Sequence, residues 1–220
     1  MKSECAAAAE AGSGDVEWDL HRPLDEWYLH DPTGIHGSGH AARVLVWANV
    51  IGCWMLERGV EVDLAVVHSA AALHDVRRLN DGHDILHGHR CATWLLDVES
   101  PALRGFSQER QSRVAYCCQW HVPSDAEAPA MTAELMCLKD ADGLDRVRLG
   151  DLDVSYLRTE LARDLVKQAQ FLCHHSYSQP GYHADPWAAV KDTTREMNLW
   201  STAKHVDWQS LRKRLWYFAC

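Results

Sequence analysis

The sequence predicts an all-α protein. Apolar residues recur with helical spacing along most of the chain, and the clearest example is the segment 36–59. Five of its residues fall at i, i+4, i+7, i+11 and i+15, which places on one helical face His40, Val44, Trp47, Ile51 and Met55. No stretch shows the alternation with period two that a half-buried strand requires, and no segment repeats another. A chain of 220 residues is long enough to bury the core of one domain.

Capping and breaking residues set the expected limits of the helices. Asp63, Ser107 and Thr132 are N-cap residues at the start of three apolar-periodic segments. The sequence Asn-Asp-Gly at 80–82 interrupts one helix, and Pro-Gly at 180–181 ends another. The expected helices cover 36–59, 64–79, 85–98, 107–121, 133–150 and 153–177, with two more after residue 185.

Three regions follow from this pattern: a flexible tail and lead-in segment at 1–27, the main helical domain at 28–178, and a C-terminal helical extension packed on it at 179–220. The N-terminus lacks the apolar run of a signal peptide, and no stretch has the length of a membrane span. The eight cysteines contain no CxxC pair, which argues against a zinc ribbon. Because no secretion signal is visible, we expect reduced thiols in a cytoplasmic protein. The tryptophan-rich C-terminal helices are a candidate surface for a homodimer.

The charge balance narrows the class of partner. Lys and Arg total 22 against 31 for Asp and Glu, a net charge of −9, which argues against general binding to nucleic acid or to an acidic membrane. A small phosphorylated substrate remains compatible, because a metal ion and a few arginines can set the local field. The 14 histidines are scattered along the chain and favour a metal protein.

Candidate metal ligands lie on separate helices. They are His40, the pair His74 and Asp75, one of the histidines 83, 87 and 89, then His121 and Asp140. Neutral imidazoles and carboxylates suit a divalent ion such as Mn, Fe, Co, Ni or Zn, and helical bundles build such sites from inward side chains of facing helices.

The segments HGSGHAARV, ALHDVRRLNDGHDILHG and LKDADGLDRVRLG resemble the HD-domain superfamily of metal-dependent phosphohydrolases, over roughly residues 30–175. The resemblance implies an HD-domain-like helical bundle that holds one or two divalent ions (Mn, Fe, Co, Ni, Zn or Mg). It assigns to the first ion His40, His74, Asp75 and Asp140. Asp75 would bridge to a second ion with His87 and His121. His87 is preferred to His83 and His89 because Gly88 admits close approach and Arg90 follows on the same helix.

The resemblance implies hydrolysis of a small, nucleotide-like phosphate ester or anhydride by metal-activated water. The residues expected to act in catalysis are Asp75, Asp81, Asp84 and Arg43. The residues expected to bind substrate phosphate are His36, Arg78, Arg90, Lys139 and Arg146. Asp142 and Asp145 are interpreted as residues that support the ligands or pair helices.

One departure from the family pattern matters. Nucleotide- and alarmone-hydrolysing branches carry an acid one turn after the His-Asp pair, where this chain has Arg77 and Arg78. The general acid is therefore unassigned, and two alternatives stay open. One is an HD-type di-iron oxygenase, which uses the same ligands. The other is a metal- and ligand-binding sensor without turnover.

Overall fold

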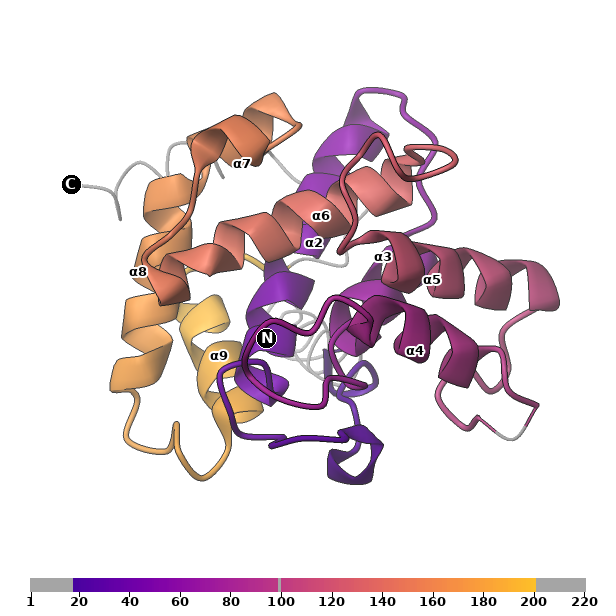
Figure 1. Cartoon of the computed structure of the whole chain (residues 1–220). Helices are drawn as coiled ribbons and strands as arrows, with labels where there is room; N and C mark the ends of the chain where they lie inside the picture. The colour runs from indigo at the N-terminus through magenta and orange to yellow at the C-terminus, as the bar shows by residue number, and fades with distance from the viewer. Residues whose placement is uncertain (1–17, 99, 201–220) are drawn as a thin grey trace, which may run out of the picture.

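The computed structural model describes residues 18–98 and 100–200, and this part of the chain is helical without any strand (Figure 1), which confirms the all-α prediction. The α-helices are α2 (Ser38–Glu57), α3 (Leu64–Leu73), α4 (His87–Leu95), α5 (Gln108–Trp120), α6 (Ala133–Asp145), α7 (Glu160–Asp164), α8 (Val166–Ser178) and α9 (Pro186–Glu196). Three 3-10 turns are η1 (Asp25–Trp27), η2 (Arg146–Leu149) and η3 (Val154–Tyr156).

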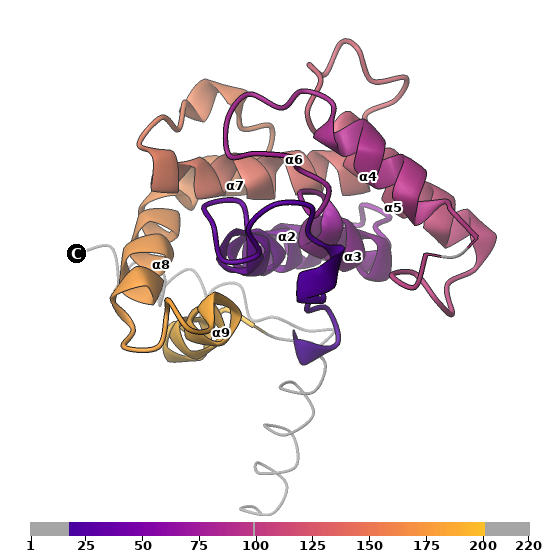
Figure 2. The same ribbon diagram turned by 60° about the horizontal axis from the view of Figure 1, so that its bottom comes forward.

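Helix α2 is the centre of the fold. Helices α3, α6 and α9 all pack against it, and nearly all of its residues are buried. Figure 2 shows α8 and α9 at one end of the molecule and α4 and α5 at the other, with α2 and α3 between them. A helix that is covered on every side needs apolar residues on all of its faces. The one face that the sequence pattern identified is therefore only part of the surface that α2 buries. The first turn of α2 carries His40 into this core.

The expected caps are present. The side chains of Asp63, Ser107 and Thr132 accept hydrogen bonds from backbone N–H groups in the first turns of α3, α5 and α6. Each bond satisfies one of the backbone donors that a helix start leaves without a partner.

Several helices are shorter than the sequence predicts, among them α3 and the helix expected over 153–177. Helix α3 ends at Leu73 rather than near residue 79, so that His74 is its C-cap and Asp75 lies in the turn that follows. The expected helix 153–177 is divided into η3, α7 and α8. The division has a local cause, because the Thr159 hydroxyl caps α7 at the break.

One hydrophobic core runs from Trp18 to Leu199. Trp18 contacts two tryptophans near the C-terminal end, with ring centroids 5.3 Å from Trp187 and 4.7 Å from Trp200. Of the expected tail, residues 1–17 lie outside the described part, as do residues 201–220 of the expected extension. Among the described helices, none has both the length and the apolar character needed to cross a membrane.

Candidate metal centre

The imidazoles and carboxylates of the site come from helix ends and from α6. His74 and Asp75 follow the last residue of α3, His87 is the first residue of α4, and His121 is the C-cap of α5. His40 enters from the first turn of α2. The last contribution comes from α6 and is made by Asp142.

A first group of donor atoms surrounds His40. Its Nε2 lies 3.1 Å from His74 Nε2, and 3.4 Å from both Asp75 Oδ2 and Asp142 Oδ1. His74 Nε2 lies 3.9 Å from the same Asp142 oxygen. The ligand atoms of His40, His74 and Asp142 all lie within 4.8 Å of one another, a spacing that suits a shared ion.

A second group surrounds the other oxygen of Asp75. Asp75 Oδ1 lies 2.8 Å from His87 Nε2 and 3.7 Å from His121 Nε2, and these two nitrogens are 2.9 Å apart. Asp75 Oδ2 instead faces His40 and, at 2.9 Å, His36 Nδ1. Asp75 Oδ1 also lies 3.8 Å from His74 Nε2, so His74 borders both groups. The nearest oxygen of this carboxylate is Oδ2 for His40 and Oδ1 for His87 and His121.

Hydrogen bonds at the far side of each ring fix its tautomer. Nδ1 lies 2.9 Å from Ala71 O in His74, 2.5 Å from Asp84 O in His87, and 2.6 Å from Cys118 O in His121. A carbonyl oxygen can only accept, so each Nδ1 carries the proton and each Nε2 presents a lone pair.

His40 follows the same rule, because its Nδ1 donates to the Asp145 carboxylate at 2.7 Å. Lone pairs that face one another at about 3 Å repel unless a cation or a proton lies between them. In addition, Asp75 Oδ1 is a buried atom without a hydrogen bond in the described part of the chain. Four imidazole lone pairs and an unsatisfied carboxylate oxygen are the donor set of a metal site, so these buried groups can hold a metal ion.

Electrostatics keep the acids ionised and His74 neutral. Burial acts to raise the pKa of Asp75, but the surrounding imidazoles of His74, His121, His36 and His40 outweigh it, and the pKa falls well below its usual range. Asp142 shows the same balance, with burial opposed by the charges of His74 and His40, and its pKa is also lowered. Burial lowers the pKa of His74 to about 3. All three side chains thus have the ionisation state that a metal ligand requires.

Asp140, the expected ligand from α6, lies elsewhere. Its fully buried carboxylate accepts hydrogen bonds from the backbone N–H of Arg158 at 2.8 Å and from the N–H and hydroxyl of Thr159, both at 2.7 Å. The structure therefore places Asp142, and not Asp140, with His40 and His74. Asp140 holds the chain at the start of α7.

Asp145 and Arg43 form the support behind His40. Arg43 Nε donates to Asp145 Oδ1 at 2.6 Å, and its NH2 group donates to Oδ2 at 3.1 Å. The opposing charge lowers the pKa of Asp145 despite burial. The interpretation of Asp145 as a supporting residue agrees with this geometry. Arg43, expected in catalysis, is fully buried and faces Asp145 and Tyr182 rather than the cavity.

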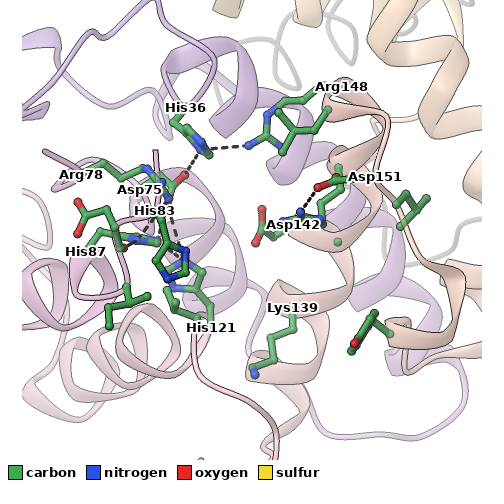
Figure 3. A pocket seen from close by; sticks show the side chains of 18 of the residues that line it. His36, Asp75, Arg78, His83, His87, His121, Lys139, Asp142, Arg148 and Asp151 are labelled. Carbon is green, nitrogen blue, oxygen red and sulfur yellow. Dashed lines mark hydrogen bonds and ion pairs between the residues drawn. The ribbon is translucent and has the colours of Figure 1, made fainter. Parts of the chain in front are cut away.

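Four members of the two donor groups, Asp75, His87, His121 and Asp142, line a cavity of about 600 Å³ (Figure 3), whereas His40 and His74 are not part of its lining. The expected site residues that line it are His36, Asp75, Arg78, Asp81, Asp84, His87, His121, Lys139 and Arg146. Of the expected phosphate-binding residues, only Arg90 is absent from this lining. Arg90 instead binds the Asp84 carboxylate and the Arg77 carbonyl.

The cavity also contains residues that the sequence did not single out. Arg158 lies on its wall because the chain between α6 and α7 turns back toward α6, and no motif in the sequence marks this residue. Arg148 also lines it and contacts His36 Nδ1 at 3.1 Å. The sequence did contain a signal for Asp142, because helical spacing places it on the same helix face as Leu138 and Lys139.

Comparisons with protein-family models, with curated proteins and with solved structures find no match for this chain. The site is therefore interpreted from its own geometry and from the order of its residues.

Proposed function

We propose that the protein is a phosphohydrolase that binds two divalent metal ions and cleaves a small phosphate ester or anhydride. The observation that carries the proposal is the position of Asp75. Its two oxygens face two groups of imidazole lone pairs, at the wall of a cavity that also holds cationic side chains.

The donor set defines the expected ions. His40, His74 and Asp142 would hold one ion and His87 and His121 the other, with Asp75 shared between them. Nitrogen and oxygen donors of this kind suit Mn, Fe, Co, Ni or Zn. When bound, such ions make water a nucleophile at neutral pH and polarise a phosphoryl oxygen.

The cationic side chains suit a phosphate group. Five line the cavity: Arg78, Lys139, Arg146, Arg148 and Arg158. Protein acceptors already hold them in place. Arg78, for example, donates to the carbonyls of Asn80 and Gly82, and Arg148 donates to the carbonyl of Ile35. Donors that are fixed before the substrate arrives need little reorganisation to stabilise a developing negative charge.

Charge balance makes anion binding depend on the metal. Six carboxylates line the same cavity, so its protein groups carry no net positive charge. Two divalent ions would reverse this and make the cavity attractive to a phosphate dianion. The apolar part of the wall would contact the organic group of the substrate, and it includes Ile85, Val122, Leu152 and Leu157.

The resemblance to HD-domain phosphohydrolases agrees with the same assignment. A histidine, a His-Asp pair and a distant aspartate occur in that order as His40, His74-Asp75 and Asp142, with the last residue two positions after the one that the resemblance assigned. We therefore place the chain among HD-type proteins as part of the proposal.

Elemental analysis of protein purified without added metal, together with its absorption spectrum, is the first test. We expect about two Mn, Co, Ni, Zn or Fe ions per chain, and hydrolysis of a phosphomonoester panel that EDTA abolishes and metal restores. Two irons with oxygen consumption and no phosphate release would identify the di-iron oxygenase instead. Tight phosphate binding without turnover would indicate a sensor, and protein that binds no metal would refute all three.

A further inference from the structure

Phosphate ester hydrolysis needs a proton for the oxygen that leaves, and the proton donor is the missing part of the function proposed above, on which this inference rests. The acids around the cavity already have partners. Asp75 and Asp142 face the histidines of the metal centre, and Asp81 Oδ2 lies 3.5 Å from His30 Nε2. Hydrogen bonds from Arg90 and from the Leu79 N–H lower the pKa of Asp84 to about 2, so it stays ionised. Asp151 binds Arg146, and Asp153 caps η3 through the Ser155 N–H.

His83 lies on the loop between α3 and α4, and hydrogen bonds fix the backbone next to it. Arg78 binds the Gly82 carbonyl at 2.7 Å, and the Asn80 side chain accepts from the Gly82 N–H at 2.8 Å. On the other side, the Asp84 carboxylate accepts from the Leu79 N–H at 2.9 Å. The loop therefore presents His83 from a defined position.

The His83 side chain lines the cavity and is exposed to solvent. In Figure 3 its ring is drawn in front of the His121 side chain. Within residues 18–98 and 100–200 no hydrogen bond, ion pair or ring contact engages it. It is thus an imidazole in the cavity that has no structural task there.

The three neighbouring histidines of the motif have three different surroundings. His87 is buried, and its ring nitrogens face Asp84 O and Asp75. His89 is exposed on α4 and does not line the cavity. Only His83 combines access to the cavity with an uncommitted ring, and imidazole is the side chain best suited to exchange a proton near neutral pH.

We propose that His83 is the general acid that protonates the leaving group. A water oxygen forms a bond to phosphorus while the bond from phosphorus to the ester oxygen breaks, and the electron pair of that bond stays on the ester oxygen. A protonated His83 nitrogen gives its proton to this oxygen, which leaves as an alcohol. The attacking water loses a proton to solvent and the neutral His83 regains one from solvent, so one ester and one water give one alcohol and one phosphate.

The test compares His83→Gln with the matched variant His89→Gln on two esters, an alkyl phosphate and p-nitrophenyl phosphate. Nitrophenolate leaves without help, whereas an alkoxide needs the proton. We expect His83→Gln to lower kcat for the alkyl ester by about 100-fold or more, the usual contribution of a general acid, and to change kcat for the nitrophenyl ester by less than about threefold. His89→Gln should leave both rates and the metal content unchanged.

A second readout separates the acid from a metal ligand. His83→Gln should keep the full metal content, and added imidazole should restore part of the alkyl esterase activity of His83→Ala. Loss of metal, or equal losses on both esters, would overturn the role of His83 and leave the phosphohydrolase intact. A wild-type protein that takes up metal but hydrolyses neither ester would refute the phosphohydrolase, and the assignment of His83 with it.

Discussion

Asp140 and Asp142 lie two residues apart on α6, and replacing each by asparagine should have opposite consequences. Asp142 faces His40 and His74 at 3.4 and 3.9 Å, and 31% of its side chain is exposed. Asp140 is fully buried, and its carboxylate accepts from Arg158 and Thr159. One residue should therefore matter for metal and the other for folding.

The magnitude for Asp140→Asn follows from its hydrogen bonds. Oδ2 accepts twice from Thr159, and Oδ1 accepts from the Arg158 N–H and, at 3.4 Å, from its guanidinium. In asparagine an NH2 group replaces one of the two carboxylate oxygens and donates instead of accepting. The two donors that faced that oxygen then have no acceptor, which costs about 1–3 kcal/mol of stability for each donor. A loss of about 3 kcal/mol in the free energy of unfolding should lower Tm by about 6–12 °C in a domain of this size.

Asp142→Asn should leave the metal-free protein almost unchanged, with Tm within about 2 °C, because that carboxylate makes no hydrogen bond to any residue of 18–98 or 100–200. Its metal affinity should fall by more than about 100-fold, since even residues that only support ligands typically contribute 10–100-fold. Thermal unfolding in EDTA and elemental analysis after dialysis against limiting metal measure the two effects. An Asp140→Asn protein that loses metal at unchanged Tm, beside an Asp142→Asn protein that keeps both ions, would refute this assignment.

The remaining predictions concern the number of bound ions, the helix packing around them and their release at low pH. Asp75→Ala removes the shared ligand and should abolish both metal binding and activity; full metal occupancy in that variant would disprove the site. His121→Ala should reduce elemental analysis from about two ions to about one, while an unchanged ratio would make His121 structural. Gly88→Ala places a Cβ 2.4 Å from Cys118 O, so α4 must move away from α5. That variant should lose about 1–3 kcal/mol of stability and the ion between the two helices, and an unchanged Tm with full metal would contradict it. Burial acts to lower the pKa of His87, but the neighbouring Asp75 carboxylate, 2.8 Å from His87 Nε2, raises it overall, whereas burial lowers the pKa of His74 to about 3. Protons thus compete for His87 at higher pH, and a falling pH should release the His87 ion first in a metal-content titration; simultaneous release would argue against two distinct groups.

Local patterns predicted much of the fold. Asp63, Ser107 and Thr132 each had the side chain that an N-cap needs, and each begins a helix. The break before α7 was not predicted, because an apolar-periodic stretch from 153 to 177 looks continuous unless the chain turns at Thr159. That turn depends on the buried carboxylate of Asp140, which lies on α6, 19 residues earlier in the sequence.

The choice between Asp140 and Asp142 shows where sequence reasoning stops. Helical spacing separates the two side chains by about 200° around α6, so only one can face His40. Both faces of α6 are covered, one by the ligand histidines and one by the start of α7, and acidic residues are present on each. The stripe that contains Leu138 and Asp142 indicated the inner face, but only tertiary packing shows what lies opposite it.

The early end of α3 helps to build the site. The carbonyls of the last helical turn have no partner within the helix. Because α3 stops at Leu73, the Ala71 carbonyl is free to accept from His74 Nδ1, three residues later. His121 repeats this arrangement at the end of α5, where its Nδ1 donates to the carbonyl of Cys118. Each ring is thus oriented by its own helix end, while the distance between the nitrogens depends on packing between helices. Substitutions at such packing contacts should therefore change the spacing of the ligands without changing the direction in which each one points.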